Sequence, residues 1–572
     1  MPRATLQRWT RVATLLLAAV GARPALCSEV VWRPPGVVPS ASAWSDTAGL
    51  SAAEATYAAA VRAHADGDPT CVDNYFRSAA HSWRDLEACL AAGRPAPPRV
   101  TELYDSALAQ MLITAQQFGR WDPCRGLSAD GVVVPARYSG FLWTPDAFAV
   151  LNPVGSYEDP VLLRQHRGTG LGLALVARRN TANPAPFTHA RQVFSATVVL
   201  RTSADRSGYE LRFYDPLRVS STMVAGRRVA IERDLSAPFA FIGLTDDRQW
   251  IDGFIRPNDG GPREGLYMIE PFQPGKIPVV LVHGLLSDPR TWVAMTNELR
   301  ARPDLNDRFQ WLAFDYATGG PFLESAARLR RQLAEFRRVY DPARRDAALS
   351  RTVLVGHSMG GLVSKLQVTE SGQTLWDAAA TAPLASVRTT PEVRRLLQAE
   401  FYFRPSPDVS RVVYIATPHL GSYWAKRPVG RLVSSMVRPS ARRNAEFDQL
   451  VRDNPGLLRN GDVDRLPTSI DLLEPSSPLL QATAALPYNP AVALHSIIGE
   501  DRYDWSGEPT DGIVPAWSAR LRGVATERVV DASHLQMNKV EPTVKEVENI
   551  LRLHLAEHAR RLAAQRTPAD WD

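Results

Sequence analysis

Cysteine is scarce in this 572-residue sequence, and the four cysteines, Cys27, Cys71, Cys89 and Cys124, all lie in its first quarter. No Cys/His spacing is typical of a zinc site, so the sequence predicts no structural zinc. If Cys27 is removed by processing, an oxidising compartment would permit one disulfide among the other three. The alternative is that these three are simply small buried residues, and the sequence does not choose between the two.

Long apolar runs and clusters of one charge are also missing. After the first thirty residues no segment has the ~20 consecutive apolar residues that a membrane-spanning helix needs. The net charge is +6, but the basic residues are spread along the chain among 60 acidic ones. A solvated surface explains this pattern better than a basic patch, so we expect no nucleic-acid partner.

The composition is that of an ordinary globular protein, with 45% hydrophobic and 22% charged residues. Because the length exceeds the usual size of one domain, we expect two or three compact units.

The first thirty residues have the pattern of an export signal. Arg3, Arg8 and Arg11 precede an apolar run from Val12 to Val20, and Ala25-Leu26-Cys27 follows with small residues where a signal peptidase cuts. The sequence therefore predicts a signal peptide over residues 1–27 and an exported protein, periplasmic or secreted. Lipid attachment at Cys27 is the less favoured alternative, because the residues before it fit such a signal poorly.

Two regions precede the C-terminal part of the chain. Residues 28–125 are predicted to be helical, with a capping box at Ser51–Glu54 and two or three helices ending near Gly119. Residues 126–271 are predicted to be mostly β, as a binding module, as a structural collar on the C-terminal part of the chain, or as an element that helps the exported protein to fold, and the structural role is favoured because no cluster of titratable residues stands there. The strand candidates there are Val193–Thr202, Tyr209–Tyr214 and Gly265–Ile269.

From residue 272 to residue 572 strands and helices alternate, which predicts an α/β fold with a doubly wound, mostly parallel sheet. An insert of low strand character, about 423–490, separates the fourth and fifth strands, and a final helix over about 542–561 carries an apolar stripe. The six strand candidates are Val279–Val282, Phe309–Phe314, Thr352–Val355, Arg411–Ile415, Ala493–Ile498 and Glu527–Val530.

A G-x-S-x-G string, Gly356 to Gly360, directly follows the third of these strands and precedes a helical pattern. In such a strand-to-helix turn the serine backbone is strained, and side chains at Gly356 or Gly360 would collide with the neighbouring elements. The turn presents the hydroxyl above the sheet, so Ser358 is the predicted nucleophile.

Serine needs a base to take its proton, and five histidines of the second half compete for that role. His357 adjoins the serine and would point away from its hydroxyl, while His283 and His419 end earlier strands. His495 lies inside a strand candidate, where a satisfied core histidine is expected. His534 follows the last strand at the edge where loops converge, so we predict it to be the base.

The base in turn needs a carboxylate to orient it. Glu500, Asp501, Asp504 and Asp511 all follow the fifth strand. Asp511 is preferred because it stands in a tight loop that the following apolar residues hold down. The resulting chain order Ser, Asp, His is that of alpha/beta-hydrolases.

Acyl transfer also needs two donors for the developing oxyanion. One is expected to be the main-chain N–H of Met359, directly after the nucleophile. The other is expected to be the N–H of Leu285, in the loop that ends the first strand, where Gly284 permits close approach and His283 supports the turn.

With these residues in place, the segment from about Lys276 to Glu557 resembles the lipase and esterase branch of the alpha/beta-hydrolase superfamily. The resemblance implies a doubly wound sheet of about eight strands, the Ser358, Asp511, His534 triad, and a cap built from the 423–490 insert. Some lipases of this branch carry a structural calcium, but no ligand set for it can be read here. Four strings in one register carry the resemblance: Val282–Leu285, Gly356–Gly361, Ala416–Ser422 and Thr510–Pro515.

The expected activity is hydrolysis of a carboxylic ester, from a small molecule or a lipid, through an acyl-enzyme and without a cofactor. Peripheral contact with a membrane or lipid surface fits this activity. The same triad would also serve acyl transfer to another acceptor, or amide or thioester cleavage. The alternative outside enzymes is an envelope-associated binding protein whose N-terminal 270 residues are the working part.

Overall fold

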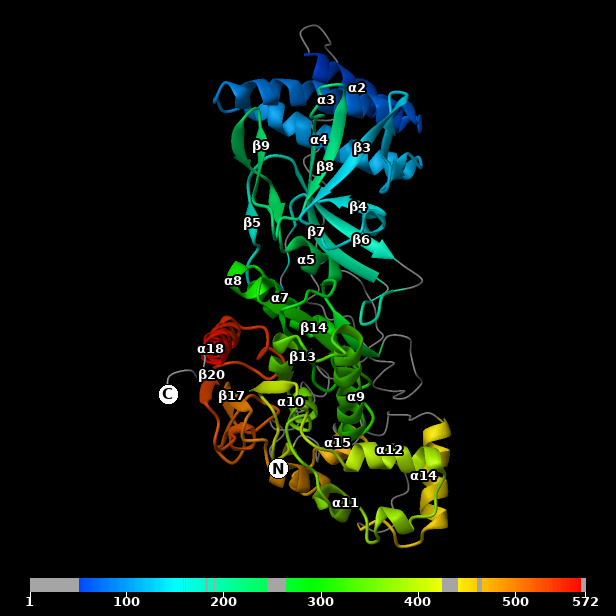
Figure 1. Cartoon of the computed structure of the whole chain (residues 1–572), viewed down its shortest axis with the longest axis vertical. Helices are drawn as coiled ribbons and strands as arrows, with labels where there is room; N and C mark the ends of the chain where they lie inside the picture. Colours follow the sequence, from blue (N-terminus) through cyan, green and yellow to red (C-terminus); the bar gives the residue numbers. More distant parts are fainter. Residues whose placement is uncertain are drawn as a thin grey trace, which may run out of the picture. The chain divides into compact units, whose positions relative to one another are not determined.

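The computed structural model describes residues 51–157, 159, 161–180, 184–189, 191–243, 264–423, 441–459 and 466–566. The predicted signal peptide lies outside these ranges. Within them the chain forms two compact units (Figure 1). Of the described residues, those from 51 to 184 and from 191 to 243 form the N-terminal unit, and residues 185–189 with those from 264 onward form the C-terminal unit.

Three helices open the N-terminal unit: α2 (Ala52–Ala65), α3 (Thr70–Ala91) and α4 (Pro98–Gln117). The predicted capping box is confirmed, since the Ser51 hydroxyl accepts from the N–H of Glu54 and the Glu54 carboxylate accepts from the N–H of Ser51 at 3.0 Å.

A seven-stranded sheet completes this unit, and all its strand pairs are antiparallel except β3 with β8. The helices and the sheet share one hydrophobic core, and polar contacts join them: Tyr104 Oη donates to the Leu200 carbonyl at 2.8 Å. The described parts of the regions 28–125 and 126–271 therefore share their main core, although the β region also has a small cluster of its own around Val176. In sheet order the strands are β1 (Trp121–Asp122), β2 (Gly126–Ala129), β3 (Val132–Ser139), β8 (Tyr209–Tyr214), β7 (Arg191–Thr202), β6 (Leu173–Asn180) and β4 (Val150–Pro153). The shorter elements are β5 (Arg167–Gly168), β9 (Ser221–Val224), β10 (Arg227–Ala230), β11 (Arg233–Asp234) and α5 (Ala237–Gly243).

The three described cysteines are free. Cys71 is buried in the core between the helices, Cys89 is half-buried and Cys124 is exposed. The structure therefore contains no disulfide among these three, and of the three only Cys71 fits the alternative of a small buried residue.

The C-terminal unit is built on a second seven-stranded sheet, in which every pair is parallel except β12 with β14. All six predicted strands are present and the predicted α/β fold class is confirmed, although the described sheet has seven strands and not eight. In sheet order they are β12 (Gly265–Met268), β14 (Phe309–Asp315), β13 (Ile277–Val282), β15 (Thr352–His357), β16 (Val409–Ile415), β17 (Ala493–Gly499) and β20 (Thr526–Val530).

The strand predicted over Gly265–Ile269 exists, but its assignment to the β region 126–271 was wrong. As β12 it pairs antiparallel with β14, with Leu266 opposite Phe314. The sequence of a short edge strand does not indicate which sheet the strand joins. The strand pairs with whichever neighbouring strand has an unpaired edge.

Alternate residues of the central strands face two different cores. Val280, Val282 and Leu354 lie in one core with helices α9 and α10, while Val279 and Leu281 lie in the other with the last helix. The predicted final helix is confirmed as α18 (Glu541–Arg566). The other helices are α7 (Val293–Arg300), α8 (Pro303–Asn306), α9 (Phe322–Tyr340), α10 (Met359–Lys365), α11 (Thr374–Ala379), α12 (Pro391–Phe401) and α17 (Ala516–Ala519).

The described part of the 423–490 insert contains three helices, α14 (Ala441–Asp453), α15 (Ser469–Leu472) and α16 (Pro478–Ala485). An ion-pair cluster fixes α14 to the α/β body. Arg443 lies 3.1 Å from Glu324 of α9 and 3.3 Å from Glu400 of α12. Burial, together with the charge of Glu324, raises the pKa of Glu400 to about 7.

A buried arginine ties β16 and β17 to α18. Arg411 Nε donates to His554 Nδ1 at 3.0 Å, and its terminal nitrogens contact His495 and Glu557. Burial, with a smaller contribution from Arg411, lowers the pKa of both histidines to about 3. The prediction that His495 is a satisfied core histidine is confirmed, since its Nδ1 also contacts Thr526 Oγ1 at 2.7 Å.

Candidate active site

Ser358 stands between β15 and α10 in the left-handed region, with φ 55° and ψ −127°. A Cβ at Gly360 would lie 2.2 Å from the carbonyl oxygen of Val282, and one at Gly356 would lie 2.6 Å from the carbonyl oxygen of Gly360. Only glycine fits at both positions, so the turn that lifts the serine above the sheet depends on them.

The structure brings the three predicted triad side chains together. His534 Nε2 lies 2.9 Å from Ser358 Oγ, and His534 Nδ1 lies 2.7 Å from Asp511 Oδ2. All three residues are less than a tenth exposed. Because a carboxylate only accepts, the hydrogen of His534 is on Nδ1, which leaves Nε2 free to accept the hydroxyl proton of Ser358.

The carboxylate of Asp511 is held by its own loop. Oδ1 accepts from the N–H of Ile513 at 3.0 Å and from the N–H of Val514 at 2.7 Å. The main-chain carbonyl of Asp511 also accepts from the N–H of His534 at 2.9 Å. The loop therefore fixes both the direction of the carboxylate and the place of the histidine.

The other three acidic residues after β17 have partners elsewhere. Glu500 forms an ion pair with Arg520 at 3.3 Å, and Asp501 pairs with Arg502. Asp504 accepts from main-chain N–H groups of its own turn. The structure brings none of them to His534.

The third string of the resemblance, Ala416–Ser422, braces the loop that carries Asp511. The N–H of His419 donates to the Ser518 carbonyl at 2.9 Å, and Ser518 Oγ donates to the Gly421 carbonyl at 2.6 Å. Ser422 Oγ donates to the Ile513 carbonyl. The sequence did not point to Ser518, because a single serine in a four-residue helix has no pattern of its own.

Of the two predicted oxyanion donors, Met359 directly follows the nucleophile and Leu285 directly follows Gly284. Met359 is the first residue of α10, so its N–H has no acceptor within the helix. A Cβ at Gly284 would lie 2.9 Å from Ser358 Cβ, which places the backbone leading into Leu285 against the serine. The next residue, Leu286, has φ 55° and donates its N–H to Thr318 Oγ1 at 3.2 Å, so the loop turns sharply there.

His283 and His419 are buried, and each ring packs against a tyrosine. The ring of His283 stacks on Tyr316 at 4.3 Å between centroids, and Tyr316 Oη donates to the His283 carbonyl at 2.6 Å, which holds the turn before Gly284. The ring of His419 meets that of Tyr414 edge-on. Burial, then the charge of Lys365, keeps the pKa of His419 well below its usual range.

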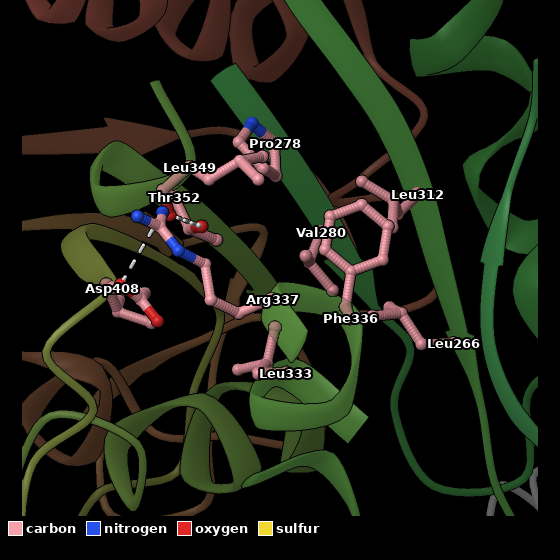
Figure 2. Close-up of a pocket in the computed structure, with 11 residues that line it drawn as sticks. Leu266, Pro278, Val280, Leu312, Leu333, Phe336, Arg337, Leu349, Thr352 and Asp408 are labelled. Atoms are coloured by element: carbon pink, nitrogen blue, oxygen red, sulfur yellow. Dashed lines mark hydrogen bonds and ion pairs between the residues drawn. The ribbon is translucent and has the colours of Figure 1, made fainter. Parts of the chain in front are cut away.

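A small cavity lies elsewhere in this unit, at the amino ends of β13, β15 and β16 (Figure 2). Pro278, Thr352 and Arg337 line it, and Arg337 pairs with Asp341 at 3.1 Å. Parallel strands have their carboxyl ends at the opposite edge, where Ser358 stands, so this cavity is not part of the triad site.

No cluster of three or more His, Cys, Asp or Glu side chains in the described ranges is arranged to hold a metal ion. In the same ranges, no helix combines the length and apolar character that crossing a bilayer requires.

Comparison with known proteins gives one family match. Residues 279–543, which include Ser358, Asp511 and His534, match the model of the alpha/beta hydrolase family. No curated protein matches the chain.

Several solved structures are similar to about half of the chain. The mature lipase BlEst2 of Bacillus licheniformis is 17% identical, covers 50% of this chain and 97% of its own, and has a TM-score of 0.30. The lipase of Staphylococcus hyicus is 12% identical, with 51% and 97% covered and a TM-score of 0.31. The metagenomic carboxyl esterase MGS0156 is 17% identical, with 50% and 76% covered and a TM-score of 0.28. Likenesses this weak carry no argument about activity.

Proposed function

Residues 279–543 of this chain belong to the alpha/beta hydrolase family, and from that premise we propose that the protein is a serine hydrolase of carboxylic esters. One observation carries the proposal: the hydroxyl of Ser358, the imidazole of His534 and the carboxylate of Asp511 form one continuous hydrogen-bonded chain. A nucleophile, a base and a group that orients the base are the parts that acyl transfer requires.

In the proposed mechanism Ser358 Oγ attacks the ester carbonyl carbon while His534 Nε2 takes the hydroxyl proton. Asp511 stabilises the imidazolium, and the N–H groups of Met359 and Leu285 donate to the oxyanion. Collapse of the tetrahedral intermediate breaks the bond to the alcohol, which leaves with the proton from His534. Water then repeats the sequence on the acyl-enzyme and releases the acid.

The surroundings of the triad support an apolar acyl group or a lipid as substrate. Leu420, on the loop after β16, is 45% exposed, and Leu535, on the loop after β20, is 61% exposed. Leu535 directly follows His534. Exposed apolar groups near a site favour contact with an apolar ligand or a lipid surface over a small polar ester.

The proposal is tested first by Ser358→Ala. We expect the variant to fold as the wild type does and kcat to fall by about 10⁶-fold, because the triad acts as a unit. The assay is hydrolysis of nitrophenyl esters from acetate to palmitate, with Ser386→Ala, an exposed serine of the η5 turn (Leu384–Ser386), as matched control. Unchanged activity in Ser358→Ala would refute the proposal.

A fluorophosphonate probe gives a second test that does not need the natural substrate. It should label the wild type at Ser358 and leave Ser358→Ala unlabelled. Labelling at another residue would show that the residue labelled, and not Ser358, is the nucleophile. Acyl transfer, thioester cleavage and amide cleavage use the same triad, so products are compared with and without an added alcohol acceptor. A wild type that is inert to every ester and to the probe would favour the non-catalytic binding protein.

A further inference from the structure

His357 is the last residue of β15 and directly precedes the nucleophile. Its side chain is buried, and its Nε2 lies 3.0 Å from the main-chain carbonyl oxygen of His534. Because a carbonyl oxygen only accepts, Nε2 of His357 carries the hydrogen and donates it. The residue before the nucleophile is thus bonded directly to the residue that carries the base.

This bond completes the attachment of His534 to its neighbours. The N–H of His534 donates to the Asp511 carbonyl at 2.9 Å, while its C=O accepts from His357 at 3.0 Å. Both main-chain groups of His534 are therefore tied to residues at the triad. The next residue, Leu535, is 61% exposed, so its side chain adds little packing to hold the backbone there. The hydrogen bond from His357 is therefore a larger part of what fixes the main chain of His534.

The two imidazole rings are also in contact, with centroids 4.9 Å apart and planes 39° apart. Burial, and next the proximity of His534, holds the pKa of His357 well below its usual range. Lys539 and His283 are the other titratable groups that act on it in the same direction. A neutral His357 can hold His534 without opposing the positive charge that His534 gains when it takes the serine proton.

We propose that His357 is a positioning residue that fixes the main chain of His534 so that its Nε2 stays within reach of Ser358 Oγ. The expected effect on kcat rests on the proposed function. The hydrogen bond between His357 and His534 belongs to the fold and does not depend on it.

Two substitutions separate this role from simple packing. His357→Gln keeps a neutral N–H donor of similar length, and His357→Phe keeps a buried ring but cannot donate. We expect kcat of the Phe variant to fall by at least ~10-fold with KM within about twofold, because a small displacement of a catalytic group is costly. The Gln variant should keep kcat within about threefold of the wild type.

A second readout is independent of activity. Hydrogen–deuterium exchange of the peptide over residues 531–538 should be faster in His357→Phe than in the wild type or His357→Gln, because the loop has lost a tether. If His357→Phe shows no cooperative unfolding transition, His357→Met replaces it. An inert wild type with the expected exchange pattern would refute the proposed function but support the tether. Wild-type kcat and exchange in the Phe variant, or equal losses in the Phe and Gln variants, would overturn the inference.

Discussion

Replacement of Asp511 by asparagine tests the triad at the group that orients the base. The two carboxylate oxygens of Asp511 have different hydrogen-bond partners. Oδ1 accepts from the N–H groups of Ile513 and Val514, and Oδ2 accepts from His534 Nδ1. An asparagine side chain has one acceptor oxygen and one donor NH₂. It can therefore replace only one of the two carboxylate oxygens.

The loop decides which way the amide points. If NH₂ faced Ile513 and Val514, two short hydrogen bonds would become donor–donor contacts, at a cost of about 1–3 kcal/mol each. The amide oxygen therefore stays on the loop side by roughly 2–6 kcal/mol, and NH₂ faces His534 Nδ1. His534 must then accept at Nδ1 and carry its hydrogen on Nε2, which removes the acceptor for the proton of Ser358.

The enzyme is active only when the amide oxygen faces His534, which is the disfavoured orientation. The free-energy difference between the two orientations therefore determines the loss of activity. At about 1.4 kcal/mol per tenfold, we expect kcat for a nitrophenyl ester to fall by about 30-fold to 10⁴-fold in Asp511→Asn. The melting temperature should change little, since the loop keeps its hydrogen bonds. Asp501→Asn, in the same connection between β17 and β20 but paired with Arg502, is the control and should keep wild-type kcat. A value for Asp511→Asn within threefold of the wild type would refute this reasoning.

Three further predictions concern stability. In Gly360→Ala the new Cβ would lie 2.2 Å from the carbonyl oxygen of Val282, so the free energy of unfolding in urea titrations should fall by about 3 kcal/mol or more. Gly208→Ala is the control: a Cβ there would have no atom beyond its chain neighbours within 4 Å, so the free energy of unfolding should change by less than about 1 kcal/mol. The free energy of unfolding should fall as pH drops from ~6.5 towards ~3, because His495 and His554 take up protons in the unfolded chain but stay neutral when buried beside Arg411. His554→Gln should make this fall less steep. An unchanged slope would contradict the lowered pKa of His554. Arg443→Met should lower the melting temperature more at pH 8 than at pH 6, because Glu400, with a pKa of about 7, is neutral at the lower pH; equal losses would count against a charge effect.

The sequence predicted the central strands because they carry short apolar runs buried on both faces, a pattern that does not depend on distant residues. The nucleophile was readable for the same reason: the two glycines, the serine and the preceding strand are neighbours in the chain. The edge strand β12 was assigned to the wrong part of the chain, because its partner is decided by an exposed edge and not by its own residues.

His534 and Asp511 were chosen by their position after particular strands, and the sequence could rank them only because parallel strands end at one edge of the sheet. The contacts around them could not be ranked at all. Nothing local distinguishes Ser518 or His357 from an ordinary serine or histidine, and both act through bonds to residues about a hundred or more positions away.

By itself, the sequence determined the alternation of strands and helices and the local geometry of the turn at Ser358, because backbone preferences and burial patterns act over a few residues. Only the tertiary structure decided which carboxylate meets His534, what holds that histidine in place, and that the helices and the sheet before residue 245 share one core. These depend on distances between segments far apart in the chain, which no local pattern encodes.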